Sequence, residues 1–166
     1  STHLLIFTKS KRDAQNAKVW ATQILEEELK LSVNQDKTSI TSLKEGVSFL
    51  GFTILPNYIV IDRKRIKRFK DKIRELTKRN SGVPIEITIA RLNRYLRGWI
   101  NYYRIANIKT FCKDNMSWIR RRLRMIKMKQ WKTYKAMHKE MRRKGIIHNG
   151  EKMNVTLWKN SKVHII

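Results

Sequence analysis

The chain has 166 residues, of which 38 are lysine or arginine and 13 are aspartate or glutamate, and its formal net charge is +25. Hydrophobic residues make up 41%, enough for a packed core, which argues against a fully disordered tail. No run of about 18 apolar residues occurs, so we expect no membrane span. The single cysteine, Cys112, excludes an internal disulfide framework and paired-cysteine zinc sites, and it favours a reducing, cytoplasmic location.

The excess positive charge lies in the second part of the chain. Residues 1–62 carry seven basic and seven acidic side chains, whereas residues 63–166 carry 31 basic and six acidic ones. Such an asymmetry indicates a polyanionic partner for the second part and a scaffold role for the first. A basic surface kept only for solubility is the alternative, but charge repulsion at this density opposes folding.

The first 62 residues predict a helix packed on an antiparallel sheet. Ser10 is expected to cap a helix over residues 11–29, in which alanine and aliphatic residues recur at helical spacing. Segments rich in apolar and β-branched residues are expected to be extended: 4–7, 31–33, 38–43, 47–54 and 58–61. The last two of these are predicted to pair as a hairpin. This is an α+β pattern with a small antiparallel, palm-like sheet and one helix.

The rest of the chain predicts a mainly α-helical bundle. Asp62 is expected to cap a helix over residues 63–79, whose apolar residues are Ile66, Phe69, Ile73 and Leu76. Further helices are expected over residues 86–104, 108–129 and 133–144. The predicted domains are residues 1–62, residues 63–145 and a tail of residues 146–166. Part of this tail is expected to pack through Val155, Leu157, Trp158 and Val163.

Side chains suited to catalysis are sparse. Nucleotidyl transfer by two metal ions needs clustered carboxylates, and the consecutive residues 26–28, all glutamate, point in different directions on one helix. The isolated aspartates occupy cap and turn positions, and the histidines lack the spacing of metal ligands. We therefore predict neither a catalytic nor a metal site in this chain, and we expect no enzymatic activity from the chain alone.

Features suited to binding nucleic acid are more abundant. Cations neutralise phosphates, and exposed aromatic rings can stack on unpaired bases. Trp99, Tyr103 and Trp118 are expected in the core, whereas Tyr102 lies off the apolar stripe. Asn93, Arg97 and Asn101 share one helix face, either for RNA contacts or for hydrogen bonds between helices. The candidate RNA contacts are Lys64, Arg65, Lys67, Arg68, Lys72, Asn93, Arg97, Asn101, Tyr102, Arg104, Arg120, Arg121, Arg122, Arg124, Lys127 and Lys129.

A twelve-residue motif within this region resembles a known family. Residues 92–103 read Leu-Asn-Arg-Tyr-Leu-Arg-Gly-Trp-Ile-Asn-Tyr-Tyr. The combination of Leu-Asn, Gly-Trp and Asn-Tyr-Tyr at this spacing resembles the maturase-specific, or thumb, domain of group II intron-encoded proteins. With the flanking basic helices, the resemblance covers about residues 62–145. It implies a thumb bundle that grips intron RNA and the RNA–DNA primer–template duplex.

The first part of the chain resembles the end of the reverse-transcriptase palm of the same family. Residues 4–10 resemble the segment that follows the Tyr-Ala-Asp-Asp motif, and Asn34 with Lys37 and Thr38 is similar to the next motif. The resemblance implies a primer grip at Phe49, Leu50, Gly51 and Phe52, and it gives Lys37 the role of a general acid toward pyrophosphate.

One departure from the family pattern concerns the metal-binding aspartates. Thr2 and His3 stand where the family has its two adjacent aspartates, and the fingers are absent from the sequence given. The chain is therefore expected to be part of a longer protein or a degenerate relative, and to be inactive as a polymerase alone. Mg²⁺ is expected only in the complete family enzyme.

Three functions follow from these observations. The leading hypothesis is an RNA-binding thumb/maturase portion of a group II intron reverse transcriptase that assists splicing. The second is one part of a split RNA-directed DNA polymerase, completed by an upstream fingers–palm polypeptide. The third is a generic basic scaffold protein that coats structured RNA, which leaves the motif at residues 92–103 unexplained.

Overall fold

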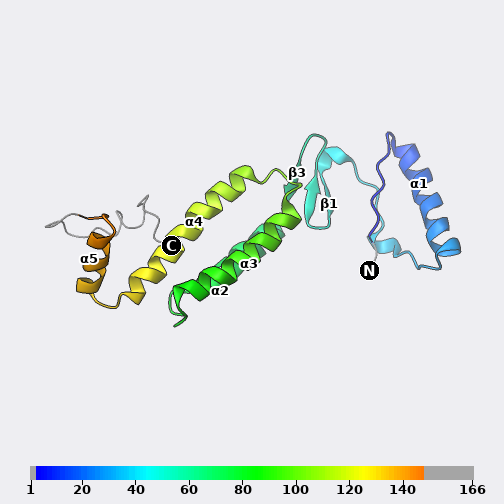
Figure 1. Cartoon of the computed structure of the whole chain (residues 1–166). Helices are drawn as coiled ribbons and strands as arrows, with labels where there is room; N and C mark the ends of the chain where they lie inside the picture. Colours follow the sequence, from blue (N-terminus) through cyan, green and yellow to red (C-terminus); the bar gives the residue numbers. More distant parts are fainter. Residues whose placement is uncertain (1–2, 148–166) are drawn as a thin grey trace. The chain divides into compact units, whose positions relative to one another are not determined.

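The computed structural model of the chain describes residues 3–147. As predicted, the fold is α+β, with a small antiparallel sheet followed by a bundle of helices (Figure 1). The chain divides into two compact units, the first ending at Asp62 and the second beginning at Arg63. No helix among the described residues is long and apolar enough to cross a membrane.

The first unit begins with helix α1 (Lys11–Gln23), which continues as one π-helical turn, η1 (Ile24–Glu28). The Ser10 hydroxyl accepts a hydrogen bond from the Asp13 amide at 3.1 Å, so the predicted N-cap and the predicted helix are confirmed. No residue of α1 is buried, and Trp20 is 67% exposed. The helix therefore contributes no fully buried core to this unit.

Several predicted strands in the first unit do not form. Residues 4–7, 31–33 and 38–43 are not strands in the described structure; two short 3₁₀ turns, η2 (Gln35–Lys37) and η3 (Leu43–Glu45), lie near the latter two segments. An extended segment becomes a strand only when a neighbouring strand completes its hydrogen-bond ladder. The apolar composition of these segments is therefore a poor guide, and the strand predictions there are wrong.

The sheet is a three-stranded meander of β1 (Val47–Phe49), β2 (Phe52–Ile54) and β3 (Ile59–Ile61). The sequence predicts one extended segment over residues 47–54, but a two-residue turn divides it and places Phe49 opposite Phe52. Leu50 and Gly51 both have positive φ, 51° and 87°, which matches the twist that a tight hairpin needs. The predicted hairpin with residues 58–61 is confirmed by pairs such as Phe52 with Ile61.

Asp62 is the last residue of the first unit. Its carboxylate accepts hydrogen bonds from the hydroxyls of Ser48 and Thr53, at 2.8 and 2.7 Å. These two bonds tie the residue after β3 back to β1 and β2. Helix α2 begins at the next residue, as predicted from the sequence.

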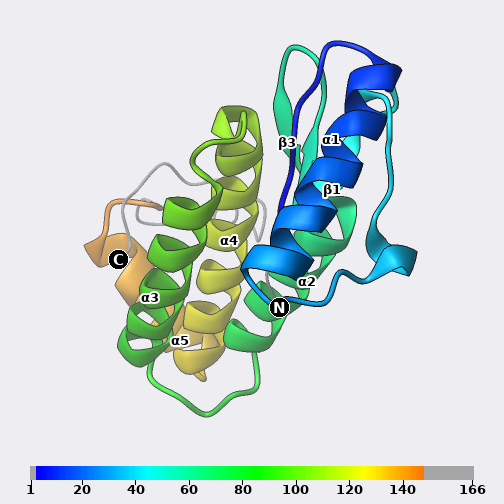
Figure 2. The same ribbon diagram turned by 90° about the vertical axis from the view of Figure 1, so that its right-hand side faces the viewer.

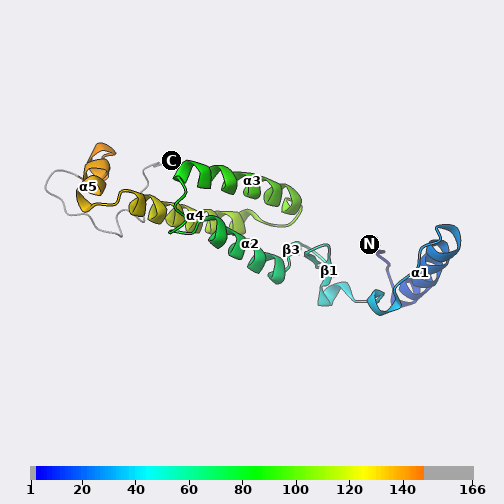
Figure 3. The same cartoon turned by 90° about the horizontal axis from the view of Figure 1, so that it is seen from below.

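The second unit is built on three helices, α2 (Arg63–Leu76), α3 (Ile85–Tyr103) and α4 (Lys109–Gln130). Their apolar stripes form one core, with Phe69 and Ile73 from α2 at 2% and 0% exposure. Figures 2 and 3 show the three helices side by side from two directions. The predicted helices at 63–79, 86–104 and 108–129 are confirmed, with ends that differ by a few residues.

A smaller cluster involves α5 (Tyr134–Arg143), the last described helix. Met137 and Met141 of α5 pack with Ile147, which is 2% exposed. The helix predicted at residues 133–144 is thereby confirmed, with Thr133 as its N-cap. The packing expected of Val155, Leu157, Trp158 and Val163 falls outside the described residues.

Candidate nucleic-acid interface

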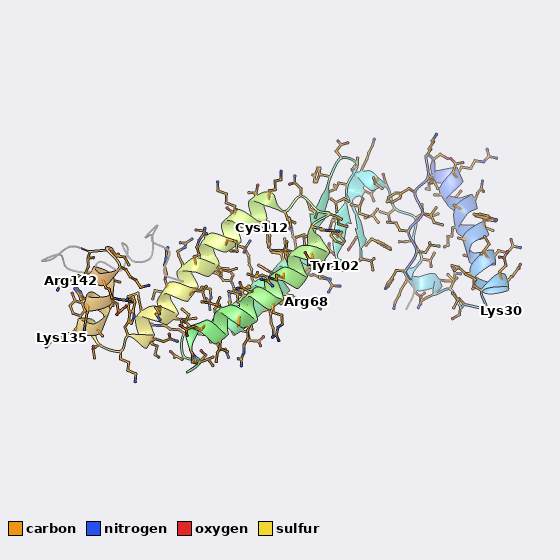
Figure 4. All side chains as sticks on the ribbon, in the orientation of Figure 1. Lys30, Arg68, Tyr102, Cys112, Lys135 and Arg142 are labelled. Atoms are coloured by element: carbon orange, nitrogen blue, oxygen red, sulfur yellow. The ribbon has the colours of Figure 1, made fainter. Side chains whose placement is uncertain are left out.

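Helix α2 presents cations along its length. Its predicted contact residues are all exposed, namely Lys64, Arg65, Lys67, Arg68 and Lys72. Lys72 pairs with Glu75 at 2.8 Å, and Arg74 pairs with Asp71 at 2.6 Å. Exposed pairs of this kind are weak, so both cations stay accessible to a polyanion. Figure 4 shows the labelled Arg68 on this helix.

Helix α3 has a polar face on the side away from the core. Asn93, Arg97 and Asn101 are exposed and make no hydrogen bond or ion pair within residues 3–147. Hydrogen bonding between helices, one of the two roles open to them from sequence, is therefore not observed. Arg94 and Arg104 share this exposure, and Arg94 was not among the predicted contacts.

The aromatic residues of α3 include some that pack on the core and one that is exposed, as the sequence predicts. The Trp99 ring is half-buried against the three-helix core, 4.4 Å from the ring of Phe69 and 5.2 Å from that of Phe111, centroid to centroid. Tyr103 is 6% exposed, whereas Tyr102 is 52% exposed and meets Tyr103 edge-on. Tyr102, labelled in Figure 4 near the end of α3, is thus the aromatic residue of this motif most open to a partner.

Arg122 has a structural position that the sequence did not reveal. Its Nε donates to the Thr77 hydroxyl at 2.6 Å, and its Nη2 donates to the main-chain oxygens of Thr77 and Arg74 at 3.2 and 3.3 Å. These groups lie at and just beyond the end of α2, where main-chain oxygens lack helical partners. The guanidinium also lies 5.4 Å from the centre of the Trp118 ring. Burial, and then the Arg74 charge, lower the pKa of Arg122.

Two further α4 side chains hold the connection between α2 and α3. Lys129 donates to the side-chain oxygen of Asn80, and the Gln130 amide donates to the Val83 carbonyl at 3.0 Å. Together with Arg122 they fasten the α2–α3 loop to the last turns of α4. Lys129, predicted as an RNA contact, therefore has a structural partner, although it is exposed.

Five further cations of α4 follow one face of the helix. They are separated by three, four or seven residues and span about 27 Å of helix axis. These residues are Lys109, Lys113, Arg120, Arg124 and Lys127. Sequence reasoning missed the first two, although their spacing to Arg120 was visible. Burial, and then the charge of Arg120, lower the pKa of Arg124.

Arg121 lies outside this stripe but is exposed. It makes no hydrogen bond or ion pair within the described part of the chain. It therefore lacks the hydrogen bonds that its neighbour Arg122 makes to the end of α2.

The residues expected from the palm resemblance are distributed over the first unit. Phe49, Leu50, Gly51 and Phe52 form the β1–β2 turn. Lys37 ends η2, where its amide donates to the Asn34 side chain at 3.2 Å, and its own side chain is exposed. His3 is exposed, and Thr2 falls outside the described residues. Within residues 3–147, no three or more His, Cys, Asp and Glu side chains are grouped so that they could hold a metal ion.

Cys112 borders a small apolar cavity lined by residues of α2, α3 and α4, among them Phe69, Trp99 and Met116. Burial raises the pKa of its thiol, which keeps it protonated at neutral pH. This environment is that of a packing residue rather than of a nucleophile.

Comparison with known families agrees with the motif at residues 92–103. The model of the group II intron maturase-specific domain matches residues 66–145, which include α2, α3, α4 and α5 almost entirely. No curated protein sequence matches the chain significantly. Residues 66–145 therefore match the group II intron maturase-specific domain, which confirms over this range the family resemblance that the motif predicts.

Proposed function

We propose that the second unit binds group II intron RNA and assists splicing by stabilising the folded intron. The observation that carries this proposal is the contrast between the two sides of the helices. The inner sides form one apolar core, whereas the outer sides of α3 and α4 carry cations such as Arg97 and Arg120 without acidic partners among the described residues. Phosphate contacts supply affinity on such a surface, and amide and aromatic side chains supply recognition.

The experiment for this proposal is competition binding at one fixed salt concentration. Folded group II intron RNA competes against an RNA–DNA primer–template duplex and an unrelated structured RNA. We expect a clear preference for the intron RNA. Equal binding to all three would contradict intron recognition and favour a generic basic scaffold protein.

Removing two α4 cations should shallow the salt dependence of RNA binding. Lys113 and Arg120 are exposed and unpaired within the described chain, so their removal should leave the core intact. For the double variant Lys113→Ala, Arg120→Ala, the slope of log K against log salt should fall by about 0.7–0.9 per lost phosphate contact. Lys9→Ala with Lys11→Ala in the first unit is the charge-matched control. An unchanged slope in the α4 variant would place this stripe away from the RNA.

A second candidate function concerns the first unit. Large apolar side chains are exposed there, including Phe7 at 61%, Val19 at 70% and Trp20 at 67%. Exposed apolar groups in this number are typical of a surface that another protein covers. An upstream fingers–palm polypeptide would cover it, supply the aspartates and Mg²⁺, and use Lys37 and the turn at residues 49–52 for primer extension. Primer extension on mixing the two polypeptides would support a split polymerase, and an inactive mixture would count against it.

A further inference from the structure

Gly98 occupies an unusual position on α3. It lies inside a 19-residue helix, on the exposed side. Apart from its chain neighbours and the backbone of its own helix, a Cβ atom placed on it would meet no atom within 4 Å. Glycine is among the least favourable residues in a helix interior because it loses the most conformational freedom. No packing contact within the described chain requires a glycine here, so a close approach from outside is the remaining structural use.

The side chains around Gly98 are those that bind a sugar–phosphate backbone. Residues three and four positions away are neighbours on a helix surface. Here they are Arg94 and Tyr95 on one side, and Asn101 and Tyr102 on the other. Tyr95 is half-buried and stacks on Phe69 of the core. The exposed groups around this position, where no side chain stands, are therefore the Arg94 guanidinium, the Asn101 amide and the Tyr102 phenol.

The charge of this face identifies the partner. Arg91, Arg94, Arg97 and Arg104 are exposed and make no ion pair within residues 3–147. The one acidic residue of α3, Glu86, lies in its first turn, twelve residues before Gly98. A polyanion therefore complements the charge of this face. An apolar helix, or a protein surface with few acidic residues, does not.

The other two helices of the bundle offer no equivalent place. Neither α2 nor α4 contains a glycine, and their outer faces carry long cationic side chains. Such side chains contact phosphates at a distance from the helix. A helix surface without a side chain lets the nucleic-acid backbone contact the helix directly. The exposed face of α3 is therefore where a backbone can come closest to the bundle.

We propose that the sugar–phosphate backbone of an RNA strand lies directly against α3 at Gly98, with Arg94 on a phosphate and Asn101 on the ribose hydroxyl side. This proposal rests on the proposed function, because it names the contact surface of that same RNA-binding unit. Glycine permits the approach, and the surrounding side chains hold the strand in register. The 2′-hydroxyl gives the Asn101 amide a group that DNA lacks.

The test uses the full chain with Gly98→Ala and Gly98→Leu, and Ala90→Leu as the matched control. Ala90 is exposed on the same helix, about 12 Å earlier along its axis. Gly98→Ala should raise the melting temperature by about a few degrees, because alanine is the better helix former. The same change should weaken binding of a folded group II intron transcript about threefold, and Gly98→Leu about tenfold or more.

The opposite signs of the two effects separate a contact role from a structural one. Unchanged affinity in Gly98→Leu, or an equal loss in Ala90→Leu, would overturn the proposal while leaving RNA binding by the unit intact. A lower melting temperature in Gly98→Ala would overturn it as well, since the glycine would then serve the fold. Failure of the unaltered chain to bind the transcript would instead defeat the proposed function itself.

Discussion

Replacing Trp99 by alanine is expected to lower the free energy of unfolding of the second unit by about 3–5 kcal/mol. The ring lies among those of Phe69, Phe111 and Tyr103, with centroid distances of 4.4, 5.2 and 4.6 Å. Its removal would leave a cavity where α2, α3 and α4 meet, and the surrounding aromatic rings would lose burial and their tilted or stacked contacts with the indole ring. Urea denaturation followed by far-ultraviolet circular dichroism measures this loss.

Tyr102→Ala is the matched control for this change. Tyr102 stands three residues later on the same helix, but it is 52% exposed, so we expect at most about 1 kcal/mol of destabilisation. In an RNA-binding assay under conditions where both variants are folded, the order should reverse. Tyr102→Ala should then weaken RNA binding more than Trp99→Ala does. A Trp99→Ala protein that keeps its stability but binds RNA poorly would show that the ring faces the nucleic acid instead of the core.

The helical bundle could be predicted because its information is local. Apolar residues such as Phe69, Ile73 and Leu92 recur at helical spacing, and each of them is buried in the structure. The extended segments of the first unit lack such information, since a strand depends on a partner elsewhere in the chain. Residues 4–7 have the composition of a strand and form none, whereas the Leu50-Gly51 turn divides a run that looked continuous.

The candidate interface could be predicted in composition but not in detail. The sequence places Arg120, Arg121 and Arg122 together as equivalent cations. A helix turns by about 100° per residue, however, so three consecutive residues face three different environments. In the structure two of them are exposed, and Arg122 is directed at the end of α2. Only the packing of α4 on α2 decides which arginine is structural, and that packing is not encoded in local charge.

Replacing Arg122 by alanine is therefore expected to destabilise the fold rather than to weaken RNA contacts. Thr77 is 2% exposed, and its hydroxyl and carbonyl would lose the guanidinium that donates to them at 2.6 and 3.2 Å. The Thr77 hydroxyl would keep its own hydrogen bond to the Ile73 carbonyl at 2.5 Å. The main-chain oxygen of Thr77 would lose its guanidinium donor, and leaving a buried group without a partner costs about 1–3 kcal/mol. The contact with the Trp118 ring would be lost as well. We expect a loss of about 2–3 kcal/mol in the free energy of unfolding.

Arg121→Ala and Arg122→Lys complete this experiment. Arg121 is exposed and unpaired in the described chain, so its removal should change stability by less than about 0.5 kcal/mol. Lysine keeps the charge but lacks the planar fork that serves several oxygens at once, so Arg122→Lys should recover only part of the loss. Full recovery by lysine would mean that charge alone matters at this position. If Arg122→Ala keeps its stability but shows a shallower salt dependence of RNA binding, Arg122 contacts the RNA and does not stabilise the end of α2.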